Sequence, residues 1–285
     1  MARAWDEHYS SVIMTSATLA IESDFMPFAE SVGFDRVSRF TETLQVESPF
    51  EAAEQSRLYT ALDLPGPDDP HFPDLVTHLL AAISRAVATK MLVLSTSYRL
   101  IDQIEPRLKE ALTSAPSDLF EKGQPVTTEV LAQRPTSSRD ALIARFRSSR
   151  AAVLLATGSF WEGMDFPGEQ LEVLVVPRLP FAVPTDPVVE GRFEHARRLG
   201  RDPFETVSLV DAVLRLKQGV GRLLRTTEDR GVVILLDHRL QTQAYGVKFL
   251  NSMPRLIQIL PDHADIVTGT VEFLGQGRKA GRGNS

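Results

Sequence analysis

Short apolar runs alternate with segments of helical periodicity along most of this 285-residue chain, and this alternation constrains the fold more than any other feature. The apolar runs lie near residues 58, 92, 154, 174 and 234, and their lengths are typical of buried strands. Strands that alternate with helices form a parallel sheet whose two faces are both covered by helices. We therefore expect an α/β fold with a mainly parallel sheet.

Charge and cysteine content exclude several classes of protein. The formal net charge is −6, so the chain as a whole has no basic footprint for nucleic acid. Local basic stretches exist, because residues 134–150 hold five arginines against one acid. The chain has no cysteine, which excludes disulfides and an iron–sulfur cluster within it. No apolar run is long enough to span a membrane and no signal peptide is visible, so we expect a cytoplasmic protein without a membrane partner.

An amide and two guanidinium groups share one helix face in the sequence Q-x-x-G-R-x-x-R. Gln218, Arg222 and Arg225 stand at i, i+4 and i+7, which places them on the same side of a helix. A guanidinium fork suits a phosphoryl group because it donates two parallel hydrogen bonds. Gly219 and Gly221 weaken a helix and permit close backbone approach. The alternative interpretation is a solvated face that binds nothing.

A glycine-rich loop, G-S-F-W-E-G-M-D-F-P-G, follows the apolar strand 151–157 directly. It places Ser159, Glu162, Gly163 and Asp165 at a strand end, where open α/β sheets bind their ligands. The alternative is a loop anchored by a buried tryptophan with its acids in water.

Two hydroxyl-rich turns also follow expected strands. Ser95, Thr96, Ser97 and Tyr98 come after the strand 90–94. Hydroxyl groups at that position can bind the phosphates of a nucleic-acid backbone, or they can cap the helix that follows. The small residues Ser16, Ala17 and Thr18 end an earlier apolar run, and the same capping alternative applies to them.

These four segments resemble, in chain order, motifs III, IV, V and VI of the DinG/XPD branch of superfamily 2 DNA helicases. The resemblance covers roughly residues 11–240, and the loop 158–168 is its most specific match. A proline-rich run of the form L-P-F-x-x-P-x-x-P, at residues 179–187, also looks like that family. The resemblance implies a RecA-like second motor domain that moves along one strand in the 5′-to-3′ direction.

The resemblance also assigns roles to the residues of the four segments. It implies that Arg222 and Arg225 touch the γ-phosphate of ATP and that Gln218 positions them. It implies a nucleotide cleft lined by Glu162, Gly163, Asp165 and Gly221. It implies contacts with single-stranded DNA by Ser95, Thr96, Ser97, Tyr98 and Ser159. Ser16, Ala17 and Thr18 would couple the ATP site to the DNA site.

The sequence contains no G-x-x-x-x-G-K-[ST] phosphate loop and no D-E-A-H box. Members of the resembled family carry both in their first motor domain, so ATP with Mg²⁺ would be bound mainly by that missing domain. We therefore expect the C-terminal part of a longer helicase, or a truncated product, whose partners are single-stranded DNA and the first motor domain. Residues 1–20 would be a remnant of that domain, 21–274 the second motor domain and 275–285 a disordered tail, with no metal site.

Two other functions remain open from the sequence. The chain could be a non-catalytic nucleic-acid-binding or regulatory module that keeps a helicase-derived fold, which the absent phosphate loop favours. It could also be an unrelated α/β enzyme that uses Glu162 and Asp165 as acid and base. That last hypothesis leaves the order of the four motifs unexplained.

Overall fold

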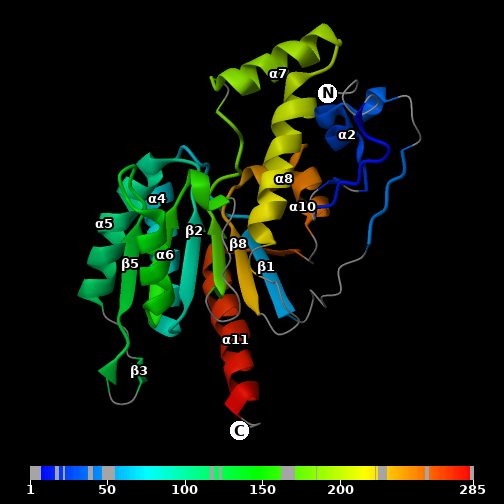
Figure 1. Cartoon of the computed structure of the whole chain (residues 1–285). Coiled ribbons are helices and arrows are strands. Elements are labelled where there is room, and N and C mark those ends of the chain that lie inside the picture. The colour runs from blue at the N-terminus through cyan, green and yellow to red at the C-terminus, as the bar shows by residue number, and fades with distance from the viewer. Residues whose placement is uncertain are drawn as a thin grey trace. The chain divides into compact units, whose positions relative to one another are not determined.

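The chain divides into two compact units, although the sequence analysis treats residues 21–274 as one domain (Figure 1). The first unit comprises Met1–Pro49 and Phe181–Gln218, and the second comprises Phe50–Pro180 and Gly219–Ser285. The computed structural model describes residues 8–16, 19–21, 23–37, 41–46, 55–115, 119–121, 124–161, 171–183, 185–221, 223, 230–253 and 257–282. Within these ranges no helix is both long and apolar enough to cross a membrane.

The second unit is built on a parallel sheet. Within the described residues seven strands pair in the order β5-β6-β2-β7-β8-β1-β9, and every neighbouring pair is parallel. Their bounds are β1 Ser56–Ala61, β2 Lys90–Leu94, β5 Thr128–Ala132, β6 Ala151–Ala156, β7 Val173–Val176, β8 Gly231–Leu235 and β9 Ile257–Leu260. The predicted parallel α/β sheet is confirmed. A short antiparallel pair, β3 Phe120–Glu121 and β4 Gln124–Pro125, stands apart from it.

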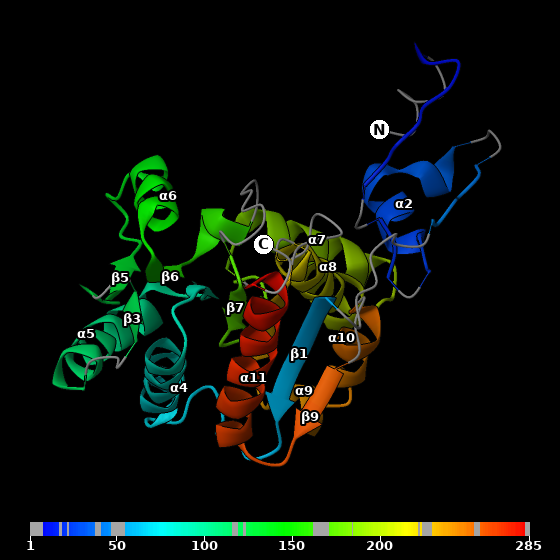
Figure 2. The same cartoon turned by 90° about the horizontal axis from the view of Figure 1, so that it is seen from below.

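The central strands are buried on both faces, which explains their uninterrupted apolar sequences. Every residue of β6, β7 and β8 is buried. Figure 2 shows α4 and α11 side by side over one face of the sheet, with α6 on the other. The helices of this unit are α4 Phe72–Ala86, α5 Tyr98–Ser114, α6 Arg139–Ser148, η2 Gly158–Trp161, α9 Arg239–Thr242, α10 Gly246–Ser252 and α11 His263–Arg282.

The C-terminal helix α11 includes part of the segment that the sequence predicts to be a disordered tail from residue 275. The helix begins at His263 and continues to Arg282, through the glycine-rich stretch. Its first half is anchored, because Ile266, Thr270 and Phe273 are buried against the sheet side of the unit. Once a helix is nucleated, each added residue gains a hydrogen bond, so glycines at the end of a packed helix do not stop it.

The first unit contains α2 Met26–Val32, η1 Phe34–Arg36, α7 Pro187–Arg198, a π-helical turn at Phe204–Ser208 and most of α8 Leu209–Val220. Asp186 caps α7, since its Oδ1 accepts hydrogen bonds from the backbone of Val188 and Val189 at 2.9 and 3.3 Å. Arg192 of α7 pairs with Asp211 of α8, with an Nη2–Oδ1 distance of 3.0 Å. This ion pair joins the two helices.

Candidate functional site

The structure brings the loop after β2 and the loop after β6 together at the carboxyl edge of the sheet. The two strands are neighbours, and the backbone N–H of Ser95 donates to the carbonyl of Ala156 at 2.8 Å. On the other side of β6, the buried Gln133 accepts a hydrogen bond from Thr157 N at 2.8 Å. Segments resembling motifs IV and V, about 60 residues apart in the chain, thus begin side by side.

Ser95 and Ser97 shape the turn after β2. Ser95 is 1% exposed, and its hydroxyl donates to the carbonyl of Ser97 at 3.0 Å and accepts from Ser97 N at 3.2 Å. The Ser97 hydroxyl caps α5 by accepting from Leu100 N at 3.4 Å. Of the two roles considered for these hydroxyl groups, Ser97 has the role of a helix cap in this structure. Thr96 is half-buried in this turn, and the half-buried Tyr98 packs in part against the hydrophobic core.

Arg99 is a basic residue of this edge that the sequence analysis missed. It is exposed in the first turn of α5, directly after Tyr98, and it pairs with no acid among the described residues. By contrast, the half-buried Arg134 forms ion pairs with Asp102 and Glu105. The signal that could have identified Arg99 is its position one residue beyond the hydroxyl turn.

The loop after β6 starts with a left-handed glycine. Gly158 is exposed and has φ 53°, a backbone conformation that other residues rarely adopt. Phe160 follows, fully buried, with the Arg139 guanidinium 5.5 Å from its ring centroid. The backbone of Ser159 lies in η2, whereas Glu162, Gly163 and Asp165 lie outside the described residues. Phe160 thus anchors the start of this loop.

The segment resembling motif VI is described only in part. Gln218 is exposed near the end of α8, in the first unit, and Gly221 is exposed in the second. Leu223 is buried, and a side chain at Gly231 would come within 2.6 Å of it, which explains the glycine at the start of β8. Arg222 and Arg225 lie outside the described residues, as do Ala17 and Thr18, while Ser16 is exposed in the first unit.

Asp237, just after β8, lies at the centre of a charged cluster. It is 1% exposed, and its Oδ2 accepts from Leu179 N at 2.7 Å, which ties the end of β7 to β8. Arg239 donates from Nε to Oδ1 at 2.8 Å and from Nη2 to Oδ2 at 2.6 Å. The hydrogen bonds that Arg239 donates to Asp237 raise the pKa of Arg239 above its ordinary value.

Arg178 fastens the loop after β1 to the end of β7. Its Nη2 donates to the carbonyl of Pro67, and its Nη1 lies 3.6 Å from Asp68. The guanidinium also stacks 5.7 Å from the centroid of Phe72, the first residue of α4. The bond to the Pro67 carbonyl and the stacking on Phe72 therefore hold the loop in place.

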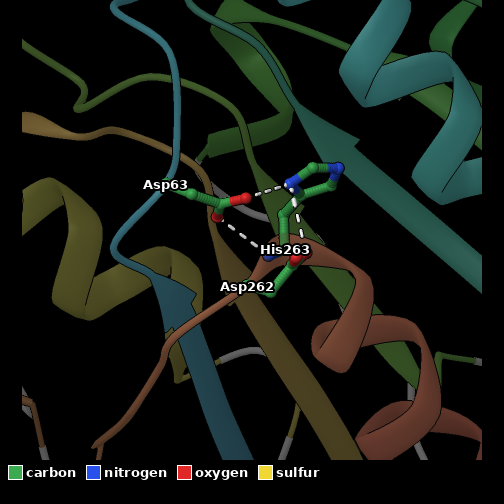
Figure 3. Close-up of side chains that lie close together, drawn as sticks. All are labelled: Asp63, Asp262 and His263. Atoms are coloured by element: carbon green, nitrogen blue, oxygen red, sulfur yellow. Dashed lines mark hydrogen bonds and ion pairs between the residues drawn. The ribbon is translucent and has the colours of Figure 1, made fainter.

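Asp63, Asp262 and His263 form a group of possible metal ligands where β1 and β9 end (Figure 3). Their ligand atoms lie within 4.8 Å of one another. Internal hydrogen bonds account for the arrangement: Asp63 accepts from His263 N at 2.8 Å and lies 2.5 Å from its Nδ1, and Asp262 accepts from Ala264 N at 2.7 Å. Both carboxylates therefore cap the first turn of α11.

A parallel sheet of this kind, with polar turns at its carboxyl edge, is typical of doubly wound α/β domains that bind ligands at that edge. The chain belongs to the helicase C-terminal domain family, whose model matches residues 80–256. It is 35% identical over 248 residues to the 3′-5′ exonuclease DinG of Bacillus subtilis and 36% identical over 244 residues to the ATP-dependent DNA helicase YoaA of Escherichia coli. Each match covers 86% of this chain, but only 25% and 35% of those proteins.

Solved structures support the fold. A structure of an XPD helicase matches with a TM-score of 0.50 and 17% identity, covering 74% of this chain and 36% of that one. Dbp5 of S. cerevisiae, bound to RNA and ADP BeF3, matches with a TM-score of 0.52 and 18% identity, covering 90% and 53%. The resemblance to the C-terminal motor domain of DinG/XPD-like helicases is confirmed.

Proposed function

We propose that this chain is the second motor domain of an ATP-dependent DNA helicase, that it supplies arginine fingers and part of the single-strand track, and that it hydrolyses ATP only together with a phosphate-loop domain. The observation that carries the proposal is the hydrogen bond between Ser95 N and Ala156 O. This bond sets the loops of motifs IV and V side by side at the edge where α/β sheets bind ligands. Membership of the helicase C-terminal domain family supports it.

The DNA strand would run along the carboxyl edge of β6 and β2. The Thr96 hydroxyl and the Arg99 guanidinium would bind backbone phosphates, while Tyr98 would offer a ring for stacking. Ser97 would contribute through its cap of α5, and Ser95 by holding the turn, while Ser159 would stay a candidate contact from η2. Contacts of this kind read no sequence, so affinity would depend on salt more than on base composition.

ATP, with its Mg²⁺, would lie against the partner domain. Arg222 and Arg225 would meet the γ-phosphate and stabilise the negative charge that spreads over its oxygens, with Gln218 positioning them. Glu162, Gly163, Asp165 and Gly221 would line this domain's share of the cleft. Ser16, Ala17 and Thr18 would couple the closing of that cleft to the binding of DNA. This coupling would move the domain along one strand.

The test is ATP hydrolysis stimulated by single-stranded DNA, measured on this chain alone and on a polypeptide that joins it to a phosphate-loop motor domain. We expect no turnover from the chain alone and stimulated turnover from the joined polypeptide. Arg225→Ala should lower the stimulated turnover by about 10³-fold, the effect of an arginine finger. The matched control is Arg215→Ala, which removes a guanidinium from α8, ten residues earlier in the chain.

Three results would contradict parts of the proposal. Turnover by the chain alone would show a complete nucleotide site within it. Near-normal turnover in Arg225→Ala would remove that residue from the role. DNA binding without turnover in the joined polypeptide would favour a non-catalytic nucleic-acid-binding or regulatory module.

A further inference from the structure

Lys217 makes a hydrogen bond across 197 residues of sequence within the first unit. It lies on α8, one residue before Gln218, and its Nζ donates to the carbonyl of Ala20 at 3.2 Å. Ala20 is 7% exposed and follows the Ser16–Thr18 segment by two residues. The bond therefore joins the segment that resembles motif III to the helix that enters motif VI.

The surroundings of Lys217 are unusual for a lysine. The side chain is half-buried, and no carboxylate pairs with it in the part of the chain that the structure describes. Burial lowers the pKa of Lys217, because removing an ammonium from water disfavours its charged form. A methionine would fill the same space without that penalty. The ammonium is thus retained at a cost in stability, and its observed contact is the Ala20 carbonyl.

A second link in the same unit provides a contrast. Arg201, after α7, pairs with Glu30 of α2 through an Nη1–Oε2 distance of 2.5 Å. Arg201 is more exposed than Lys217, and it precedes Gln218 by 17 residues in the chain. Both links join the N-terminal segment to the helical pair α7 and α8, but only Lys217 is adjacent to a residue of the motif VI segment.

We propose that Lys217 is a positioning residue that makes the segment after Ser16 move together with the end of α8 that carries Gln218. The inference rests on the proposed function, in which motif III couples the ATP site to the DNA site. A helix moves as a rigid rod over one turn, so a shift of the Ala20 backbone reaches Gln218 through a single side chain. Lys217 itself touches neither DNA nor ATP in this scheme.

The first experiment uses the joined helicase polypeptide and compares Lys217→Met with Lys217→Arg. Methionine keeps the packing and removes the donor, whereas arginine keeps a cationic donor that can reach the carbonyl. In Lys217→Met we expect the ratio of DNA-stimulated to unstimulated turnover to fall by at least about fivefold, the low end of coupling between sites. The KM for ATP should change less than about twofold, and Lys217→Arg should recover most of the ratio. The control Arg201→Gln should keep the ratio.

The second experiment measures amide hydrogen exchange on the 285-residue chain itself. The amides of residues 19–21 should exchange faster in Lys217→Met and regain protection in Lys217→Arg. If wild type is stimulated by DNA and Lys217→Met is stimulated equally, the inference is overturned and the proposed function stands. If stimulated and unstimulated turnover fall by the same factor without recovery in Lys217→Arg, Lys217 is only structural. If wild type shows no stimulation, the proposed function itself fails.

Discussion

The carboxyl ends of β5, β6 and β2 carry amide and hydroxyl groups, whereas those of β7, β8, β1 and β9 carry charged groups that bind one another. We call the first set the hydroxyl half of the edge: Gln133, Thr157 and Ser95 to Tyr98, with Arg99 beside them. We call the second set the charged half: Arg178, Asp237, Arg239, Asp63, Asp262 and His263. Both halves belong to one sheet and follow strands of similar burial.

The difference lies in where the polar groups find partners. Asp237 accepts hydrogen bonds from Leu179 and Arg239, so its charge is neutralised inside the protein. In the hydroxyl half, Ser95 and Ser97 also bond internally, but Arg99 has no acidic partner among the described residues. Paired buried charges fix a fold, while unpaired exposed cations attract phosphate. The proposed function therefore expects DNA binding in the hydroxyl half, whereas the paired groups of the charged half stabilise the fold.

The largest expected effect is the loss of stability in Asp237→Ala. Removing this carboxylate leaves Arg239 without its buried partner and Leu179 N without an acceptor. We expect the free energy of unfolding to fall by about 3–5 kcal/mol, measured by urea denaturation. The control Asp68→Ala removes an exposed carboxylate near Arg178 and should change stability by less than about 0.5 kcal/mol.

Asp237→Ala also tests directly whether the charged half and the hydroxyl half have different roles. At temperatures where the variant is folded, its affinity for single-stranded DNA should stay within about twofold of wild type, because the charged half is not assigned to DNA. A variant that is as stable as wild type but binds DNA poorly would show that the two halves share the binding task.

The next effect is expected in the hydroxyl half, from Arg99→Gln. Losing one phosphate contact should weaken DNA binding several-fold and reduce the slope of log K against log salt by about 0.7. Fluorescence anisotropy of an oligothymidine at several salt concentrations measures both. The matched control is Arg107→Gln on the same helix, because Arg107 pairs with Asp74 at 2.9 Å. Equal losses in both variants would mean a general charge effect instead of a contact.

A smaller effect is expected from Asp63→Ala in the charged half. This change removes the acceptor for His263 N at the start of α11, and we expect a loss of about 1 kcal/mol in unfolding free energy. Addition of Mg²⁺ or Mn²⁺ to wild type should leave the melting temperature unchanged. A rise that disappears in Asp63→Ala would reveal a cation site, since a ligand of the folded state stabilises it by mass action.

Much of the fold follows from local patterns. The runs near residues 58, 92, 154, 174 and 234 are the strands β1, β2, β6, β7 and β8, because strands buried on both faces are continuously apolar. β9 was missed because it has four residues, two of them exposed, at the edge of the sheet.

Contacts between distant residues could not be predicted in the same way. Leu179 and Asp237 are 58 residues apart, and Ala20 and Lys217 are 197 apart. A sequence pattern shows that each residue lies at a strand or helix end, but the pairing depends on the order of strands in the sheet and on helix packing. The hydroxyl turn after β2 was predictable because the hydrogen bonds of the Ser95 and Ser97 hydroxyls given above join residues within five positions.

The smallest expected effect concerns Tyr245, whose hydroxyl interacts with Arg239 in the charged half. Burial raises the pKa of Tyr245, although the nearby Arg239 acts in the opposite direction. Below the ordinary pKa of about 10 the phenol is neutral in both states, so it has no pH-dependent effect. As pH rises above 10, the unfolded chain releases this proton first, and stability is lost up to the higher pKa of the folded state.

Tyr245→Phe should therefore remove part of the alkaline loss of stability, at a cost of about 1 kcal/mol at pH 8 for the missing hydrogen bond. Urea denaturation at pH 8 and pH 10.5 measures the difference between variant and wild type, in which the contributions of the other tyrosines cancel. An unchanged loss between the two pH values would mean that Tyr245 is as well solvated in the folded protein as in the unfolded chain. The charged half would then be open to water near Arg239. Of the two residues Tyr245 and Asp237, only Asp237 would then support the contrast between a buried charged half and an exposed hydroxyl half.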